Sequence, residues 1–254
     1  MSAMVSVVMP ARNSARHLEQ AVESVVLQTH RDWELIVVDD GSTDATWSIL
    51  GRLAARDARI RTLRLPHSAG PARARNLAIQ SAAGRFIAFL DSDDLWLPAK
   101  LERQLDVMQR TGAVLSFTAY RKIDSHGNLG HSVIEVPPTV TYAELLKTNV
   151  IACLTAVYDA LALGKMVMPE GRHEDYALWL AILRRTSGAA GTPAVGINEA
   201  LACYRVHDGS VSHNKLKAAG LQWAVYRQVE RLSLRRSLYY FLHYAWHGLR
   251  KALR

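Results

Sequence analysis

The chain contains the stretch Trp33-Glu-Leu-Ile-Val-Val-Asp-Asp-Gly-Ser-Thr-Asp44, in which an apolar run of strand length ends in two acids and a turn. The run at 33–38 is nearly all apolar, so we expect both of its faces to be buried. Gly41 and the three residues after it are of the types favoured in turns and at helix starts. This order of strand, acids and turn predicts an α/β fold, with helices on both faces of a parallel sheet.

Strand and helix patterns continue to alternate on both sides of this stretch. Further strands are predicted at 5–9, where Pro10 ends the run, and at 59–65, 85–90, 113–124 and 199–204. Helices are predicted at 15–29 with Ser14 as its cap, after Asp44, at 71–82, from near Pro98, at 142–147 and at 175–185. A polar, glycine-containing loop is predicted at 206–214, and the chain from 215 onward is predicted to be helical.

The composition is that of a globular protein with a substantial core. The chain has 254 residues, of which 49% are hydrophobic and 21% charged, and it contains two cysteines. These values argue against disorder over the whole chain. Two cysteines cannot form a disulfide framework, so we expect an intracellular protein. We also expect no signal peptide, because Asn13, Arg16 and Glu19 interrupt any apolar core in the first 30 residues. No apolar run reaches the roughly 18 residues that a membrane-spanning helix needs.

The net charge of +8 is concentrated in the tail at 215–254. This segment contains nine Lys or Arg and one acid, Glu230, whereas 1–214 contains 22 basic and 22 acidic residues. A neutral body argues against binding to nucleic acid. Apolar residues of the tail recur every three or four positions, at Leu234, Leu238, Phe241, Leu242, Ala245, Trp246, Leu249 and Leu253. A basic amphipathic helix of this kind predicts contact with an anionic membrane surface; the alternative is a helix that packs on the body.

Candidate ligand-binding residues, most of them polar, follow four of the predicted strands. They are Pro10 to Asn13 after the first, Asp39 and Asp40 at the end of the second, Arg73 and Arg75 after the third, and Asp91-Ser92-Asp93-Asp94 after the fourth. Ligands of open α/β sheets bind outside the carboxyl ends of the strands, so these residues are expected to converge. They form a candidate ligand site.

Each of these groups has both a chemical and a structural interpretation. Asp91 and Asp93, two residues apart, suit Mn²⁺ or Mg²⁺, which proteins hold with one or two carboxylates plus substrate phosphates. A carboxylate at 39–40 suits the N3–H of a uracil or thymine ring, and Arg75 suits a diphosphate. Alternatively, the acids only cap helices and line solvated turns. The glycine-rich motifs of dehydrogenases and P-loop proteins and the G-x-S-x-G motif of α/β-hydrolases are absent from the sequence.

Taken together and in order, the motifs resemble those of glycosyltransferase family 2, which has a GT-A fold. The matching segments are Val5 to Pro10, Gln28 to Asp44, Gly70 to Asn76 ending in Ala-Arg-Asn, Ala83 to Asp94 with Trp96 and Pro98, His173 to Leu180, and Tyr204 to His207. The resemblance implies a Rossmann-like α/β fold with a mostly parallel central sheet. It also implies a GT-A catalytic domain at 1–214, with a nucleotide-binding half at 1–98, an acceptor half at 99–214, and the amphipathic helical tail at 215–254.

The resemblance also assigns roles to individual residues. The donor nucleotide would be bound by Pro10, Ala11, Asn13, Asp39, Asp40, Arg75, Asp91, Ser92, Arg205 and His207. Asp93 and Asp91 would ligate Mn²⁺ or Mg²⁺. Asp175 would be the catalytic base and Glu174 would lie on the acceptor side. The sequence departs from the family pattern at Arg12, where many relatives have an aromatic residue.

The expected activity is transfer of a sugar, with inversion, from a nucleotide-sugar donor, expected to be a UDP-sugar. The acceptor would be a lipid-linked or polysaccharide glycan of the bacterial cell envelope, and the enzyme would lie on the inner face of the cell membrane. Asp175 lies near the predicted start of a helix, where an anion is favoured and stays ionised. The alternative is a non-catalytic nucleotide-binding or scaffolding member of the same fold.

Overall fold

The computed structural model describes residues 4–171, 173–187, 193–206 and 215–252. Its strands are β1 (Val5–Ala11), β2 (Trp33–Asp40), β3 (Ile60–Leu65), β4 (Phe86–Phe89), β5 (Leu95–Trp96), β6 (Leu115–Ile123), β7 (Leu129–Ile134), β8 (Thr139–Val140), β9 (Val157–Asp159) and β10 (Ala194–Arg205). Within the described residues they form one sheet in the order β3-β2-β1-β4-β9-β6-β10-β5. In addition, β7 pairs with β6 and β8 pairs with β10.

The first half of the chain forms the parallel part of the sheet, as the sequence predicts. β1 pairs in parallel with both β2 and β4, and β2 pairs in parallel with β3. The connecting helices are α1 (Leu18–Val26), α2 (Thr46–Arg56) and α3 (Pro71–Ser81). Because the chain leaves β1 toward β2 and later returns to β4 on its other side, the strand order reverses beside β1. Such a reversal leaves a crevice at the carboxyl ends of the strands.

The second half is mixed. Its helices are α4 (Lys100–Thr111), α5 (Tyr142–Lys147), α6 (Ala160–Leu163) and α7 (Glu174–Thr186), with a 3₁₀ turn at Cys153–Thr155. β9 lies antiparallel between β4 and β6, which joins the two halves of the sheet. β10 pairs in parallel with β6 and antiparallel with β5 and β8. An all-parallel arrangement is therefore found only among the first four strands, and the second half mixes one parallel pair, β6 with β10, with antiparallel pairs.

Two predictions about the first loop are wrong. Pro10 does not end β1, because the strand continues to Ala11 and Pro10 still pairs with Val38. The ladder to β4 stops at Val8, so the missing N–H of Pro10 costs no hydrogen bond on that side. The first helix begins at Leu18, and Ser14 does not cap it with its side chain. Its hydroxyl lies instead 2.7 Å from that of Ser92, in the loop after β4.

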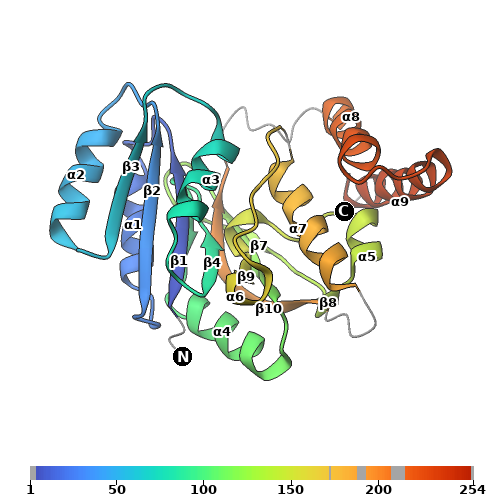
Figure 1. Cartoon of the computed structure of the whole chain (residues 1–254), viewed down its shortest axis with the longest axis horizontal. Helices are drawn as coiled ribbons and strands as arrows, with labels where there is room; N and C mark the ends of the chain where they lie inside the picture. Colours follow the sequence, from blue (N-terminus) through green and yellow to red (C-terminus); the bar gives the residue numbers. More distant parts are fainter. Residues whose placement is uncertain (1–3, 172, 188–192, 207–214, 253–254) are drawn as a thin grey trace.

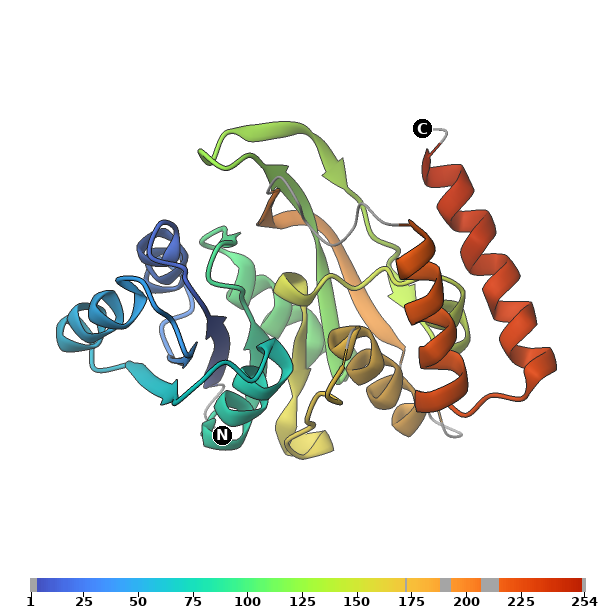
Figure 2. The same cartoon turned by 90° about the horizontal axis from the view of Figure 1, so that it is seen from above.

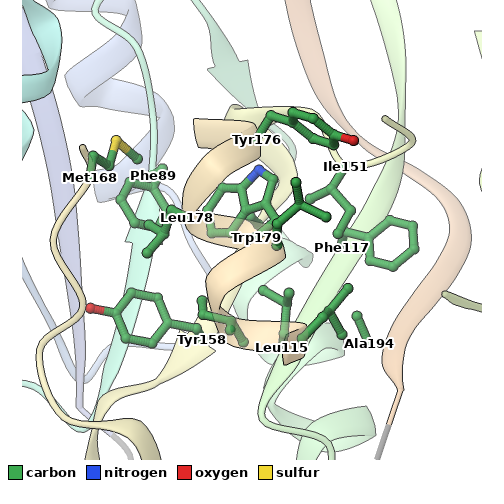
Figure 3. Close-up of a cluster of buried hydrophobic side chains, with 14 of the residues drawn as sticks. Phe89, Leu115, Phe117, Ile151, Tyr158, Met168, Tyr176, Leu178, Trp179 and Ala194 are labelled. Carbon is green, nitrogen blue, oxygen red and sulfur yellow. The ribbon is translucent and has the colours of Figure 1, made fainter. Parts of the chain in front are cut away.

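Helices cover both faces of the sheet and enclose two apolar cores (Figures 1 and 2). One core, with α1, α2 and α4, contains Val5, Val7 and Met9 of β1. The other, with α3, α5 and α7, contains Val8 of the same strand. Figure 3 shows the centre of the second core, where the Phe89 ring lies 5.3 Å from that of Trp179 in an edge-on contact. Burial on both faces explains why these strands do not alternate.

The tail is helical, as predicted, and part of it packs on the body. It forms α8 (Lys215–Ala224), a π-helical segment (Val225–Val229) and α9 (Leu234–Ala252). Val225, Tyr226 and Tyr240 are buried in the same core as α7. Figure 2 shows α8 and α9 side by side at one end of the molecule. Within the described residues, no helix has the length and apolar character that would let it cross a membrane.

Candidate active site

A cavity of about 270 Å³ opens at the carboxyl ends of β1, β2 and β4, where the sequence predicts a ligand site. It is lined by Pro10, Ala11, Arg12, Asp40, Gly70, Pro71, Arg75, Asp91 and Ser92. Six of the predicted donor-binding residues are in this lining. Gly70 and Pro71 are lining residues without a predicted role. Gly70 has a φ of 92°, and Pro71 begins α3, so the pair bends the chain sharply from the β3 loop into the helix.

Asn13 ties the loop after β1 to the loop after β2. Its backbone N–H donates to Ser42 Oγ at 2.9 Å, and its Oδ1 accepts from the Thr43 N–H at 2.9 Å. Its φ of 47° is in the left-handed region, which asparagine tolerates better than most residues. Asn13 is therefore beside the cavity and shapes its wall, although it is not among the lining residues.

The two acids at the end of β2 have different surroundings. Asp40 is saturated: it accepts from Ser68 Oγ at 2.8 Å and from the backbone N–H groups of Ala69 at 2.7 Å and Gly70 at 3.0 Å. It thereby holds the loop that leads into α3. Gly41 permits this close approach, because a Cβ at that position would lie 2.7 Å from the Ser68 nitrogen. Asp40 therefore lines the cavity, but both of its carboxylate oxygens already accept hydrogen bonds from the protein.

Asp39 is fully buried and only partly satisfied. Its Oδ1 accepts from the backbone N–H of Ser42 at 3.1 Å. Its Oδ2 lies 3.0 Å from Nε of Arg64 but makes no hydrogen bond of acceptable geometry. A buried carboxylate oxygen without a hydrogen bond is costly, and it retains the capacity to accept one from a ligand.

Arg75 connects the acidic loop after β4 with the start of α7. Its guanidinium donates to Asp91 at 2.6 Å and to Glu174 at 3.1 Å, and its side chain is only 8% exposed. Burial disfavours the charged guanidinium, but the neighbouring Asp91 and Glu174 outweigh it and raise the pKa of Arg75. Its Nε has no hydrogen-bond partner. A permanently charged group thus lies between the two acidic segments that the sequence assigns to donor and acceptor.

Asp175 is in the first turn of α7, as predicted. Its Oδ1 accepts from the Tyr176 N–H at 2.7 Å. Part of its surface is exposed, yet enough protein surrounds it that burial raises its pKa above the ordinary value, with Arg75 and the Tyr176 hydrogen bond acting against the rise. Asp175 is not among the lining residues of the cavity, but its neighbour Glu174 bonds Arg75, which is. A carboxylate with a raised pKa is a better proton acceptor than one at its ordinary value.

Arg205 lies beneath the acidic loop. It is 1% exposed, and its backbone N–H donates to Asp94 Oδ1 at 2.8 Å while its Nε donates to the Asp93 carbonyl at 2.7 Å. Its remaining guanidinium nitrogens bond the Asp124 carbonyl at 3.2 Å and Gln20 Oε1 at 3.1 Å. In this structure Arg205 braces the loop that carries the predicted metal ligands and does not line the cavity. His207, predicted to accompany it, lies outside the described residues.

The acidic loop suits a divalent cation that is completed by substrate. Asp91 and Asp93 offer carboxylate oxygens, the ligands that Mg²⁺ and Mn²⁺ prefer, at the rim of the cavity. Among the described residues, no three His, Cys, Asp or Glu side chains are grouped so as to hold a metal ion by themselves. A cation at this loop would therefore take its other ligands from water and from diphosphate oxygens, as Mg²⁺ commonly does.

Comparison with known proteins agrees with this geometry. The sequence model of the family described as Glycosyl transferase family 2 matches residues 6–158, which include β2, β4 and all of β1 except its first residue. The chain belongs to glycosyltransferase family 2. It is 41% identical over 98% of both chains to TuaG of Bacillus subtilis (strain 168), which is named as a glycosyltransferase of teichuronic acid biosynthesis. The protein is thus a glycosyltransferase, as the sequence predicted.

A second relative carries a more detailed name. The chain is 38% identical, over 98% of its own length and 94% of the relative's, to WfgD of Escherichia coli, named UDP-Glc:alpha-D-GlcNAc-diphosphoundecaprenol beta-1,3-glucosyltransferase. Among solved structures, the S. aureus TarS 1-349 fragment in complex with UDP-GlcNAc has a TM-score of 0.71 at 20% identity, covering 95% of this chain and 71% of that one. That similarity establishes the predicted GT-A fold.

Sequence reasoning missed the contacts that connect distant segments. The hydroxyl of Ser14 meets that of Ser92, and Arg205 supports Asp93 from a strand more than a hundred residues away. Asn76, quoted above only as the end of the Ala-Arg-Asn motif, bonds the backbone of Met168. Of these residues, Ser92, Asp93 and Arg205 are predicted as site residues from the sequence, whereas Ser14, Asn76 and Met168 are not. Single motifs do not indicate which segments they will contact.

Proposed function

We propose that the protein transfers a sugar, with inversion and with a divalent cation, from a UDP-sugar to a glycan acceptor in cell-envelope polysaccharide synthesis. The observation that carries the proposal is Arg75, buried and bonded at once to Asp91 and Glu174. It holds the start of α7 next to Asp91, which lines the cavity, and direct transfer requires the bound donor and the bound acceptor to be adjacent. In this proposal 1–98 bind the donor and 99–214 the acceptor.

Asp175 is the proposed base. It would accept the proton of the acceptor hydroxyl while that oxygen attacks the anomeric carbon, so that one displacement inverts the configuration. The Tyr176 N–H fixes one of its oxygens, which leaves the other for the acceptor. Arg75 would stabilise the negative charge that develops on the departing diphosphate. Mn²⁺ or Mg²⁺, held by Asp91 and Asp93, would supply further positive charge at that diphosphate.

The base of the donor is proposed to be uracil. Asp39 retains a buried oxygen without a hydrogen bond near the end of β2, and the N3–H of uracil is a donor that it can accept. The name of the Escherichia coli relative also specifies UDP-Glc. Pro10 and Ala11 would pack against the base from the cavity wall. Arg205 and His207 are proposed to act on the donor side, Arg205 by supporting the acidic loop.

The acceptor is proposed to be a glycan on a lipid diphosphate, and the enzyme to lie on the inner face of the cell membrane. The name of the Escherichia coli relative WfgD specifies a GlcNAc-diphosphoundecaprenol acceptor. The α9 face turned away from the body carries Leu234, Leu238, Leu242 and Trp246, which are between 48% and 69% exposed. Glu230, the one acid of the tail, is buried against Tyr142 and Arg184, so it does not offset the basic side chains. An apolar face on a basic tail suits an anionic leaflet.

The proposal is tested by release of UDP from the purified protein. UDP-Glc, Mn²⁺ and GlcNAc-diphosphoundecaprenol are supplied together, and UDP is measured with and without a chelator. We expect turnover that needs the metal, and we expect Asp93→Ala to weaken donor binding in Mn²⁺ and to abolish turnover. Asp106→Ala is the matched control, because Asp106 is an exposed acid paired with Arg110 on α4.

The scaffolding alternative makes the opposite prediction. A non-catalytic member would bind UDP but release none from UDP-Glc, whichever acceptor is supplied. If Asp93→Ala turns over at the wild-type rate, the metal assignment is wrong. A ligand present at a hundred times its Kd stabilises the folded protein by about 2.7 kcal/mol, which raises the melting temperature measurably. If neither UDP nor UDP-Glc raises the melting temperature at about 100 μM, a hundred times a micromolar Kd, the assignment of the nucleotide site is wrong.

A further inference from the structure

The segment 164–171, which we call the strap, connects α6 to the region before α7 and lies against α3. In the view of Figure 1 it passes between α3 and α7. Three residues of α3 hold it at successive turns. Gln80 accepts through its carbonyl from Lys165 Nζ at 2.8 Å, Asn76 bonds Met168, and Arg73 pairs with Glu170 at 3.2 Å. The strap is thus fastened along the length of one helix.

The contact made by Asn76 differs in kind from the other two. Its Nδ2 donates to the Met168 carbonyl at 2.8 Å, and its Oδ1 accepts from the Met168 N–H at 2.7 Å. One side-chain amide therefore satisfies both backbone polar groups of one residue, as a neighbouring strand would. Arg73 and Glu170 are 62% and 73% exposed, and ion pairs of that kind contribute about 0–1 kcal/mol. The Asn76 pair fixes both the position and the direction of the strap backbone.

Two paths connect this contact to the proposed base. Arg75, the residue before Asn76, bonds Glu174 in the first turn of α7. Met168 is 1% exposed and belongs to the core that contains Phe89 and Trp179 of α7, and Figure 3 shows its side chain beside Phe89. Adjacent residues of α3 therefore hold the strap and the start of α7, and the core packing joins the two.

We propose that Asn76 is a positioning residue, which holds the strap so that Glu174 and Asp175 stay beside Arg75, a lining residue of the donor cavity. The inference rests on the proposed transfer reaction and adds to it a residue that contacts neither donor nor acceptor. An Asp at 76 would keep one acceptor but would present a carboxylate to the Met168 carbonyl. A Leu has a side chain branched at the same atom, is somewhat larger and makes neither bond. Both changes would leave the cavity lining intact and free the strap backbone at Met168, while Tyr158 would still bond the strap at Met166.

The test separates positioning from donor binding. Asn76→Asp and Asn76→Leu are compared with Lys165→Met, which removes a strap contact at the exposed end. The donor Kd is measured by calorimetry with UDP-Glc and Mn²⁺, and kcat is measured with GlcNAc-diphosphoundecaprenol. We expect both Asn76 variants to lose at least about tenfold in kcat, the loss expected when a general base is misplaced. Their donor Kd should stay within about twofold of wild type, and Lys165→Met should match wild type in both.

A pH profile distinguishes positioning from simple loss of stability. Burial raises the pKa of Asp175, so a released strap that admits water should lower that pKa and move the acid limb of kcat to lower pH. A variant that is only less stable would keep the wild-type limb. Unchanged kcat in both Asn76 variants, or an equal loss of donor affinity and kcat, overturns the proposal.

If the wild-type protein is inactive, the proposed function is refuted. The positioning role of Asn76 is then tested by a second measurement that does not depend on activity. Amide hydrogen exchange of the strap and the first turn of α7 is then compared between wild type, Asn76→Leu and Lys165→Met. Exchange at least about tenfold faster in both segments of Asn76→Leu alone supports the positioning role. Equal exchange in all three proteins overturns it.

Discussion

At the residue scale, Asp175 is the group on which the proposed chemistry depends most. Asp175→Asn keeps the shape and the hydrogen bond from the Tyr176 N–H but cannot accept a proton. We expect the rate of transfer to fall at least about 100-fold, the usual contribution of one general base, with the donor Kd unchanged. The measurement is UDP release under single-turnover conditions, together with calorimetry of UDP-Glc binding.

The pH dependence gives the same prediction an independent check. Because burial raises the pKa of Asp175, the carboxyl is protonated and inactive below a pH that lies above the ordinary aspartate range. The wild-type rate should therefore rise with pH through that raised pKa, and this limb should vanish in Asp175→Asn. Glu174→Gln is the control, since it removes a partner of Arg75 but not the proposed base. Full activity in Asp175→Asn with loss in Glu174→Gln would move the base to Glu174.

Residues near the site differ in how well the sequence alone predicted their place. Asp40, Asp91 and Ser92 were predicted because acids and turn residues after parallel strands must meet at one edge of the sheet. The sequence did not predict the position of Arg205 under the acidic loop. That position depends on hydrogen bonds to Asp124 and Gln20, which lie in two other parts of the chain. A motif predicts that a residue is needed, whereas tertiary contacts determine which atoms it touches.

At the scale of elements, length and burial decided what could be predicted. β2 and β4 are buried throughout, so their apolar runs stand out from the sequence. β9 has three residues between a 3₁₀ turn and α6, too few to show any period, yet it joins the two halves of the sheet. The short strands of the second half pair antiparallel with partners distant in sequence, and hydrophobic pattern carries no information about such pairing.

We predict that the contact between α5 and the tail contributes measurably to the free energy of unfolding. Glu230 is 7% exposed and accepts from the hydroxyl of Tyr142, which begins α5. Tyr142→Phe removes that bond and should lower the free energy of unfolding by about 1.5–3 kcal/mol, the range for a bond to a charged group. The melting temperature should fall by several degrees. Tyr239→Phe, at a ring that is 52% exposed, should melt like wild type; equal melting of Tyr142→Phe would mean that the tail is only loosely attached.

At the scale of the whole molecule, the charge distribution was readable from the sequence but the arrangement of the tail was not. The alternative of packing on the body holds for one apolar face of α9, whereas its other apolar face is exposed and contact of that face with a membrane stays a prediction. Tyr240 is 8% exposed and packs into the core, while Leu238 and Leu242 on another face are 48% and 69% exposed. A helical wheel cannot separate two apolar faces when one of them is covered by a segment distant in sequence, as α5 covers α9 here.

The exposed face of α9 therefore makes the membrane proposal testable without truncation, which would remove Val225 and Tyr226 from the core. The full-length protein should co-sediment with vesicles of phosphatidylglycerol and phosphatidylcholine, and binding should weaken as salt rises, because each basic residue near an anionic surface contributes about 1 kcal/mol. Leu238→Glu with Leu242→Glu should weaken binding at least about tenfold, since burying one leucine is worth about 1.5–3 kcal/mol. The control is Leu27→Glu, 54% exposed directly after α1, which lies at the other end of the sheet from α9 (Figure 1). Equal binding of the two variants, or none by wild type at low salt, would mean that this face of α9 does not meet a membrane.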